Sequence, residues 1–239
     1  MSSPTPSPNS GPEPHPAAPH SAVPLSLTER RKAETRMQIA RAAAALFVRQ
    51  GLRATRAEDI AQAAGIAPRT FYRYFATKEE SVAPLYAAGA ERWARAVRLA
   101  PPELSLPEAL EHAVRHTLTP GVGVSASSWE WVRTLIRLAA SSPALGKVWA
   151  EVCHDSERTL AEVLAERLGT GDSAAGEADD NVALAPELRF AAAVAAAAVR
   201  VAVESWAAGE ARPESEQGPA ALALRNLAVL RGIAWGKLA

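Results

Sequence analysis

Apolar residues along most of this chain recur at spacings of three and four, which is the period of an α-helix. In the first such stretch, residues 28–50, Ile39, Ala43, Leu46 and Phe47 share one face, and Gly51 follows as a helix-ending residue. Alanine is abundant, aromatic residues are few, and no convincing run alternates with period two between turn residues. The pattern predicts an all-α protein.

The next stretch, residues 55–78, predicts two short helices joined by a tight turn. Thr55 and Glu58 have the spacing of a capping box, so we expect a helix to begin at Arg56. Small apolar residues then form one face, and Gly65 can adopt the left-handed conformation that ends a helix. Pro68 suits the first position of the following helix, because its missing amide proton is not needed there.

The second short helix, RTFYRYF, divides into an inward and an outward face. Phe71 and Phe75 lie four residues apart and predict the inward face, and the remaining long side chains point elsewhere: Arg69, Tyr72, Arg73 and Tyr74. An ordinary helical hairpin with an aromatic core is the alternative. Two arginines and two tyrosines on two turns exceed what a core needs, and they favour a helix-turn-helix that docks on DNA.

The rest of the chain predicts a roughly six-helix bundle. Proline residues and capping boxes delimit its helices at about 78–99, 105–118, from 127, 142–168, 186–208 and 217–235. Thr77 and Glu80 form the box of the first helix and place Lys78 in its first turn. A cation is mildly unfavourable there, and a nearby phosphate would explain it. We therefore divide the chain into a tail (1–27), a DNA-binding domain (28–76) and a C-terminal domain (77–239).

At the helix-turn-helix positions the sequence resembles the TetR family of bacterial transcription regulators. The family pattern of Thr, Ile-Ala, Ala-Gly-Val/Ile, Thr-Phe-Tyr, Tyr-Phe and Lys-Glu is matched by Thr55, Ile60-Ala61, Ala64-Gly65-Ile66, Thr70-Phe71-Tyr72, Tyr74-Phe75 and Lys78-Glu79. Ala67 departs from the pattern, because the family usually has Ser or Thr as the N-cap of the recognition helix. Outside this motif the chain agrees with the family only in length and helical character.

The resemblance implies a homodimer that binds double-stranded, near-palindromic operator DNA as a repressor and releases it when a small effector enters the C-terminal bundle. Arg69 and Thr70 are then the expected base-reading residues, Pro68 can touch a thymine methyl group, and Arg73 can act on bases or phosphates. The expected phosphate contacts come from Thr55, Arg56, Tyr72, Tyr74 and Lys78. The last two helices of the bundle correspond to the family's dimer interface.

Charge is distributed as DNA binding requires. The net charge of the 239 residues is zero, but residues 28–80 hold 11 Lys or Arg against 6 Asp or Glu, and the chain from residue 81 holds 15 against 19. The basic third of the chain is therefore the part that can attract phosphate.

Three further features bear on the compartment. Residues 1–27 hold eight of the 18 prolines and no Lys or Arg, which predicts disorder and excludes a signal peptide. The single cysteine, Cys153, fits a reducing cytoplasm and predicts a buried apolar thiol. The apolar run at 191–199 is bracketed by charges, so we interpret it as a closely packed helix and expect no membrane partner.

Large aromatic and arginine side chains in the alanine-rich C-terminal region are the candidates for effector binding: Trp129, Arg133, Arg137, Trp149, Arg200 and Trp206. Aromatic residues can line an apolar cavity, and an arginine at its mouth can hold a carboxylate or phosphate. Relatives with a similar hairpin suggest a lipophilic or acyl-type effector. The alternative is that the tryptophans fill core space, in which case the protein is a ligand-independent DNA-binding dimer.

An enzyme on a helical bundle is the remaining alternative, and the sequence argues against it. His112 and His116 lie four apart, but no third metal ligand accompanies them. His154, Asp155 and Ser156 are adjacent, so on a helix they face apart, and no nucleophile elbow or phosphate-binding glycine loop is present. We therefore expect no catalytic site, no metal and no cofactor.

Overall fold

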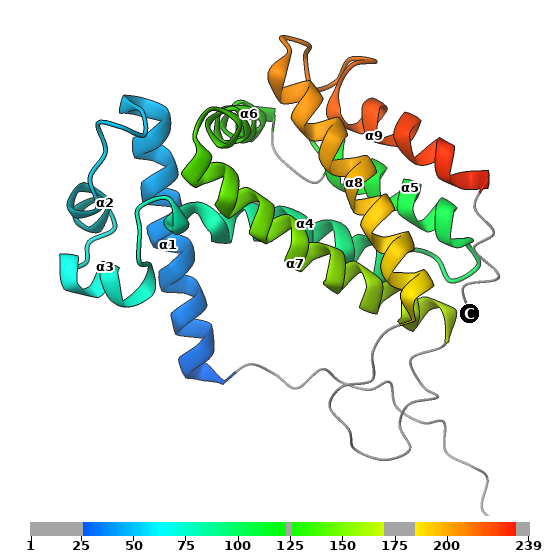
Figure 1. The fold of residues 1–239 in the computed structure, drawn as a ribbon, viewed down its shortest axis with the longest axis horizontal. Coiled ribbons are helices and arrows are strands. Elements are labelled where there is room, and N and C mark those ends of the chain that lie inside the picture. Colours follow the sequence, from blue (N-terminus) through cyan, green and yellow to red (C-terminus); the bar gives the residue numbers. More distant parts are fainter. Residues whose placement is uncertain (1–25, 123–125, 170–184, 233–239) are drawn as a thin grey trace, which may run out of the picture.

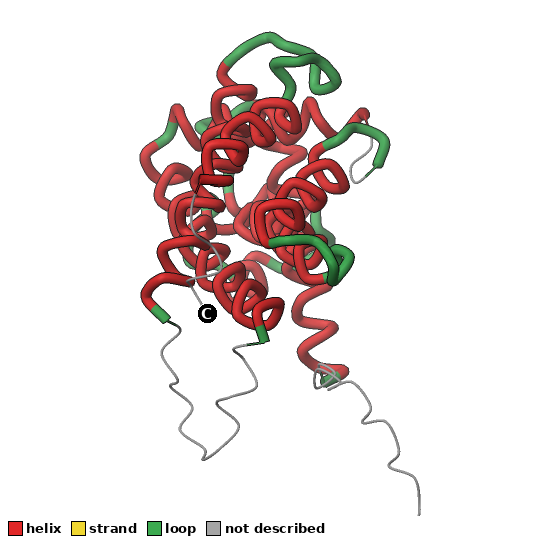
Figure 2. Tube along the Cα trace, turned by 90° about the vertical axis from the view of Figure 1, so that its right-hand side faces the viewer, coloured by secondary structure: helices red, strands yellow, loops and turns green. Residues whose placement is uncertain are grey.

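A computed structural model describes residues 26–122, 126–169 and 185–232, and all regular structure in them is helical (Figure 2). This confirms the all-α prediction. Nearly all of the predicted tail, 1–27, lies outside the described residues, as do residues 233–235 of the last predicted helix. The elements are α1 Leu27–Gln50, α2 Ala57–Ala63, α3 Pro68–Tyr74, η1 Glu80–Val82, α4 Ala83–Arg98, α5 Leu106–Leu118, α6 Ala126–Ser141, α7 Pro143–Leu168, α8 Pro186–Ala208, α9 Pro219–Ala228 and η3 Val229–Gly232.

Helices α1, α2 and α3 form a small unit at one end of the molecule (Figure 1). Its core is built from the apolar faces predicted by the spacing, with Ile39, Phe47, Ile60 and Phe71 at most 1% exposed. Ser26 caps α1 by accepting a hydrogen bond from the Glu29 amide, 3.2 Å away, and Gly51 ends the helix with a φ of 83°.

Helix α4 leads from this unit into the bundle, where it lies beside α5 and α7 (Figure 1). Helix α7 also packs on α8, and α8 packs on α9. The bundle core is made largely of leucine and alanine, and α8 contributes a row of small buried residues: Ala191, Ala192, Ala195, Ala196 and Ala202. Small side chains let helices approach closely, which explains how an alanine-rich helix is held.

Helix α8 is the one helix among the described residues that is long and apolar enough to cross a membrane by length and composition. A single helix of this kind is weak support for a membrane span, because core helices pass the same test. Its packing against α6, α7 and α9 agrees with the prediction of a closely packed helix.

The two parts of the molecule share one apolar cluster. Leu135 and Ala139 of α6 and Leu145 and Val148 of α7 belong to the same buried group as the core of α1–α3. The phenol of Tyr86, near the start of α4, donates a hydrogen bond of 2.9 Å to the Leu135 carbonyl. The parts of the chain before and after the predicted boundary at residue 76 therefore share one packed core. The division into domains stays a prediction.

Several predicted helix boundaries are confirmed, and others differ from the structure. Helices α7 and α8 begin at Pro143 and Pro186 and end at Leu168 and Ala208 as predicted. Helix α6 is described from Ala126, so Ser127 lies inside its first turn rather than at its cap. The first helix of the bundle was expected from Lys78, but α4 begins at Ala83 after a 3₁₀ turn.

Candidate DNA interface

The turn between α2 and α3 is set by Gly65. Its φ is 68°, and its amide donates to the Gln62 carbonyl at 3.0 Å. The next amide, that of Ile66, donates to the Ala61 carbonyl at 2.9 Å, which completes a Schellman motif. Ile66 packs on the core of α1–α3. The helix end predicted at Gly65 is thus present, and Ile66 fills the corner between the two helices.

Helix α3 presents the predicted outward face. Phe71 and Phe75 are 0% and 3% exposed and turn inward. Thr70 and Tyr74 are half-buried, and the exposed side chains are those of Pro68, Arg69, Tyr72 and Arg73. The helix has no side-chain N-cap at Ala67, in agreement with the departure noted in the sequence, and Pro68 occupies its first turn.

The capping of α2 differs from the prediction. The backbone N–H of Arg56 donates to the Asp59 carboxylate at 2.9 Å, so Arg56 is the N-cap and the helix begins at Ala57. Thr55 is 1% exposed, and its hydroxyl donates to the Gly51 carbonyl at 2.8 Å. Its side chain closes the loop after α1 and has no surface to offer a phosphate, so the predicted phosphate contact by Thr55 is not supported.

Lys78 also has an unexpected position. Its ammonium group donates to the carbonyls of Leu52 and Thr55, at 2.7 and 2.8 Å. The residue lies before the 3₁₀ turn that precedes α4, so it is not in the first turn of an α-helix and the dipole argument does not apply. The α-helix starts late because Pro84 lies in its first turn, where a missing amide proton is tolerated.

The outward face is linked to α2 through Tyr72. Its phenol donates to the Glu58 carboxylate at 3.3 Å. Desolvation and the neighbouring carboxylate raise the pKa of Tyr72, so the phenol keeps its proton and remains a donor. Arg69 and Arg73 are exposed on the same short helix, which leaves their guanidinium groups available to an approaching duplex.

Two residues of α1 that the sequence analysis missed hold the C-terminal ends of α2 and α3. Gln38 donates to the Ala64 carbonyl at 3.2 Å, and Arg36 donates to the Tyr74 carbonyl at 3.2 Å. No local signal marks them, because their partners lie 26 and 38 residues away in the chain.

The predicted effector residues fall into two groups. Trp129 and Trp206 pack edge to face at 5.4 Å, and the Arg133 guanidinium lies 4.4 Å from the Trp206 ring centroid. In the second group, Trp149 packs against the same aromatic cluster, but its indole donates to the Glu204 carboxylate at 2.7 Å, and Arg200 pairs with that carboxylate at 3.2 Å.

Arg133 and Arg137 of α6 both bind the protein itself. Arg137 donates to the carbonyls of Ala207 and Gly209 at the end of α8, at 2.6 and 2.7 Å, and Arg133 donates to the Ala211 carbonyl. Positive charge at the C-terminus of a helix is favourable. In this conformation the two arginines therefore anchor α6 to the end of α8, and their role in effector binding stays a prediction.

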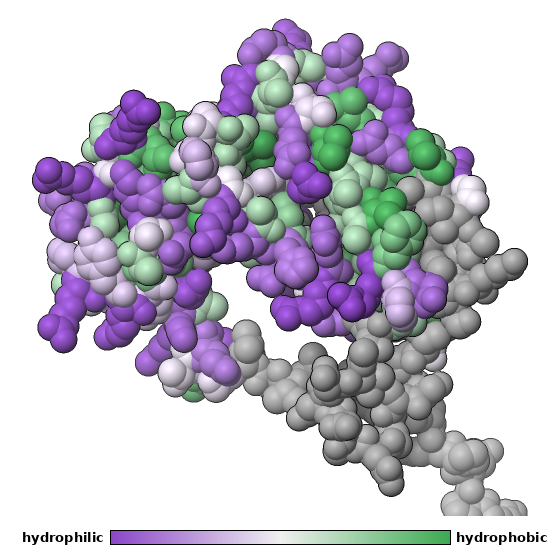
Figure 3. Space-filling model, viewed as in Figure 1, coloured by the Kyte–Doolittle hydropathy of each residue, from purple (hydrophilic) through white to green (hydrophobic). Residues whose placement is uncertain are grey.

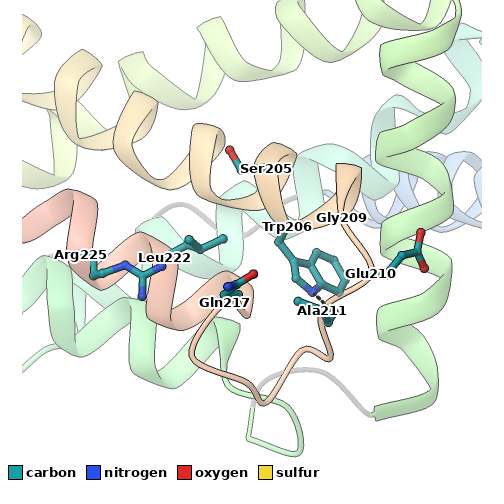
Figure 4. Close-up of a pocket in the computed structure, with 8 residues that line it drawn as sticks. All are labelled: Ser205, Trp206, Gly209, Glu210, Ala211, Gln217, Leu222 and Arg225. Atoms are coloured by element: carbon teal, nitrogen blue, oxygen red, sulfur yellow. Dashed lines mark hydrogen bonds between the residues drawn. The ribbon is translucent and has the colours of Figure 1, made fainter.

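The best-defined pockets of the described structure are small. One, of about 250 Å³, lies between the end of α8, the following loop and α9, where the Trp206 indole donates to the Ala211 carbonyl (Figure 4). Another, of about 100 Å³, lies between α4 and α7.

The single cysteine, Cys153, lies on α7 next to Val152, which lines the second pocket. Burial raises the pKa of Cys153 to about 12, so its thiol is protonated at neutral pH.

Comparison with known proteins agrees with the fold and the motif. Residues 39–82 match the family model described as bacterial regulatory proteins, tetR family. The HTH-type transcriptional regulator TcmR of Streptomyces glaucescens is 31% identical over 185 residues, which cover 75% of this chain and 76% of TcmR.

Solved structures share the fold at low identity. GusR of Salmonella enterica superposes with a TM-score of 0.50 at 19% identity, covering 83% of this chain and 94% of GusR. A structure titled as a TetR-family regulator from Syntrophomonas wolfei gives 0.52 at 20% identity, covering 83% and 93%. The extent of the TcmR match, together with the helix-turn-helix, shows that this chain belongs to the TetR family of bacterial transcription regulators, a family of DNA-binding regulators rather than enzymes.

Proposed function

We propose that the protein is a homodimeric repressor whose α3 helices read a near-palindromic operator in successive major grooves, about one helical turn or ~34 Å apart. The observation that carries the proposal is the exposed face of α3, where Arg69, Tyr72 and Arg73 stand clear of the core formed by Phe71 and Phe75. Arg69 and Arg73 lie outside the core cluster of α1–α3, and the composition of this face suits base edges and phosphates.

Within this face we assign base reading to Arg69 and Thr70, with Pro68 against a thymine methyl group. Tyr72, Tyr74, Arg56 and Lys78 are the proposed phosphate contacts, and Arg73 serves either purpose. Lys78 uses two of its three N–H donors on backbone carbonyls, which leaves one for a phosphate.

Arg69→Ala tests the base-reading role. We expect operator affinity to fall by about 1–3 kcal/mol, with a much smaller loss on random DNA, because only the operator supplies a matched guanine. Fluorescence anisotropy on both duplexes measures the difference. Arg95→Ala, which removes an exposed arginine of α4, is the matched control and should change neither affinity.

An equal loss of affinity on operator and random DNA would assign Arg69 to phosphate binding, and an unchanged operator affinity would exclude it from the interface.

Dimerisation through α8 and α9 is the second part of the proposal. Phe190 and Val201 of α8 are 61% and 45% exposed, and Val229, just after α9, is 79% exposed. Apolar patches interrupt the polar surface over this part of the molecule (Figure 3). Burying these exposed apolar side chains against a second copy of the chain would remove them from water, which supports an interface on α8 and α9.

Release of the operator by a small, lipophilic effector in the bundle is the third part. An effector that binds better to a conformation with altered spacing of the two α3 helices would shift the dimer away from DNA. The small pockets and the internally paired arginines favour a second candidate, a ligand-independent DNA-binding dimer. A thermal-shift screen against lipophilic compounds separates the two: a stabilising compound that also lowers operator affinity supports the effector model.

A further inference from the structure

The recognition helix α3 has little stability of its own. It spans seven residues, Pro68–Tyr74, and its N-cap, Ala67, contributes no side-chain hydrogen bond. Helices shorter than about 12 residues are marginal in water because nucleation is unfavourable. The conformation of α3 therefore depends on contacts from elsewhere in the protein.

Arg36 supplies such a contact at the C-terminal end of α3. Its Nη1 donates to the Tyr74 carbonyl at 3.2 Å, and its guanidinium carbon lies 4.6 Å from the centroid of the Phe75 ring. Phe75 is only 3% exposed, and its amide donates back to the Phe71 carbonyl at 3.0 Å. One side chain thus satisfies a terminal carbonyl, places positive charge at the negative end of the helix dipole and packs on the aromatic ring that fixes the helix end.

The neighbouring helix is held in the same way. Gln38, two residues further along α1, donates to the Ala64 carbonyl at the end of α2. The two helices of the motif are therefore both tied to α1 through their C-terminal carbonyls, while the outward residues Arg69 and Arg73 remain exposed.

We infer that Arg36 is a positioning residue for DNA reading: it holds α3 in its docking orientation through Tyr74 and Phe75 and does not itself contact DNA. The inference rests on the proposed role of α3 as the DNA-reading helix. It assigns a function to a residue of α1 that lies outside the helix-turn-helix motif.

The experiment uses the full-length protein and a duplex selected by the wild type from a pool of random sequences. We expect Arg36→Ala to lower affinity for the selected duplex about tenfold, as a lost charged hydrogen bond would, and affinity for a scrambled duplex less than twofold. The slope of log K against log salt should stay at the wild-type value, because no phosphate contact is lost. A slope reduced by about one unit, with equal losses on both duplexes, would mean that Arg36 binds phosphate and would overturn the inference.

Two further variants sharpen the test. Arg41→Ala removes an exposed arginine of the same helix and should leave the ratio of specific to nonspecific affinity unchanged. Arg36→Lys keeps the charge but loses the planar group that stacks on Phe75, so we expect only partial recovery of that ratio. Full recovery by lysine would show that charge alone suffices and would contradict positioning by geometry.

Amide hydrogen exchange gives a readout that needs no DNA. We expect Arg36→Ala to speed exchange at the Phe71 and Phe75 amides, which are hydrogen-bonded within α3, and to leave α5–α9 unchanged. Unchanged exchange at these amides would overturn the inference, as would a uniform increase across the bundle. If the selection from random duplexes returns no consensus sequence, the proposed function fails. The hydrogen-exchange result then still decides whether Arg36 holds α3 in place.

Discussion

Two side chains near the interface, Thr55 and Lys78, close the loop between α1 and α2. The Thr55 hydroxyl binds the Gly51 carbonyl, and the Lys78 ammonium group binds the carbonyls of Leu52 and Thr55. An ammonium group that donates to two carbonyls replaces the water those groups would otherwise need. Lys78 therefore stabilises the folded loop whether or not it also binds a phosphate.

Lys78→Met should lower the free energy of unfolding by about 2 kcal/mol, because two carbonyls lose a charged donor. Urea denaturation of the full-length protein measures this change. Lys147→Met is the matched control: Lys147 is exposed and makes only a long ion pair of 3.8 Å with Glu151, so its loss should cost less than about 0.5 kcal/mol. Equal effects of the two substitutions would rule out a structural contribution from Lys78.

At the level of elements, the turn between α2 and α3 determines how the recognition helix leaves the domain. The Schellman motif at Gly65 uses two backbone hydrogen bonds that only a left-handed residue can make at that position. A Cβ atom at Gly65 would meet no atom within 4 Å, so the restriction comes from backbone conformation and not from crowding.

The same substitution at two glycines should therefore have opposite effects. Gly65→Ala should destabilise the protein by about 1–2 kcal/mol, the cost of a left-handed conformation for a residue with a Cβ. Gly89→Ala should stabilise it by about 0.5–1 kcal/mol, because Gly89 is an exposed residue inside α4 with open space around its Cβ position. Thermal unfolding of both variants tests the two predictions. The strain argument would be contradicted if Gly65→Ala did not lower the unfolding temperature relative to Gly89→Ala.

At the scale of the whole molecule, two apolar regions matter. One is the core that α1–α3 share with α6 and α7, and the other is the exposed apolar surface of α8 and α9. The shared core joins α1–α3 to α6 and α7, so the DNA-binding end is packed against the bundle within one chain. The exposed apolar residues of α8 lie beyond this core and have no partner surface within the described part of the chain that would cover Phe190 or Val201.

Phe190→Asp should convert the proposed dimer into a monomer, because it places a charge in an apolar interface. Sedimentation velocity measures the change, and operator binding should weaken with it. Leu99→Asp changes an apolar residue that is 74% exposed at the end of α4 and should leave the dimer intact. A wild-type protein that sediments as a monomer, or a Phe190→Asp variant that remains dimeric, would contradict the proposed interface.

The sequence by itself determined the helical class, most helix boundaries and the outward face of α3. These depend on capping residues, prolines, a left-handed glycine and apolar spacing, all of which act within a few residues. Some helix starts were predicted incorrectly: α2 is capped at Arg56 and not at Thr55, and α4 begins at Ala83 although the Thr77 hydroxyl does accept a hydrogen bond from the Glu80 amide.

Only the tertiary structure decided which partners the long polar side chains take. Arg36 meets Tyr74 across 38 residues, Trp149 meets Glu204 across 55, and Arg137 meets Ala207 across 70. A guanidinium group can donate to a carbonyl, a phosphate or an effector carboxylate, so its residue type does not identify its partner. The partner is decided by which carbonyls the packing of α1, α6 and α8 leaves within reach.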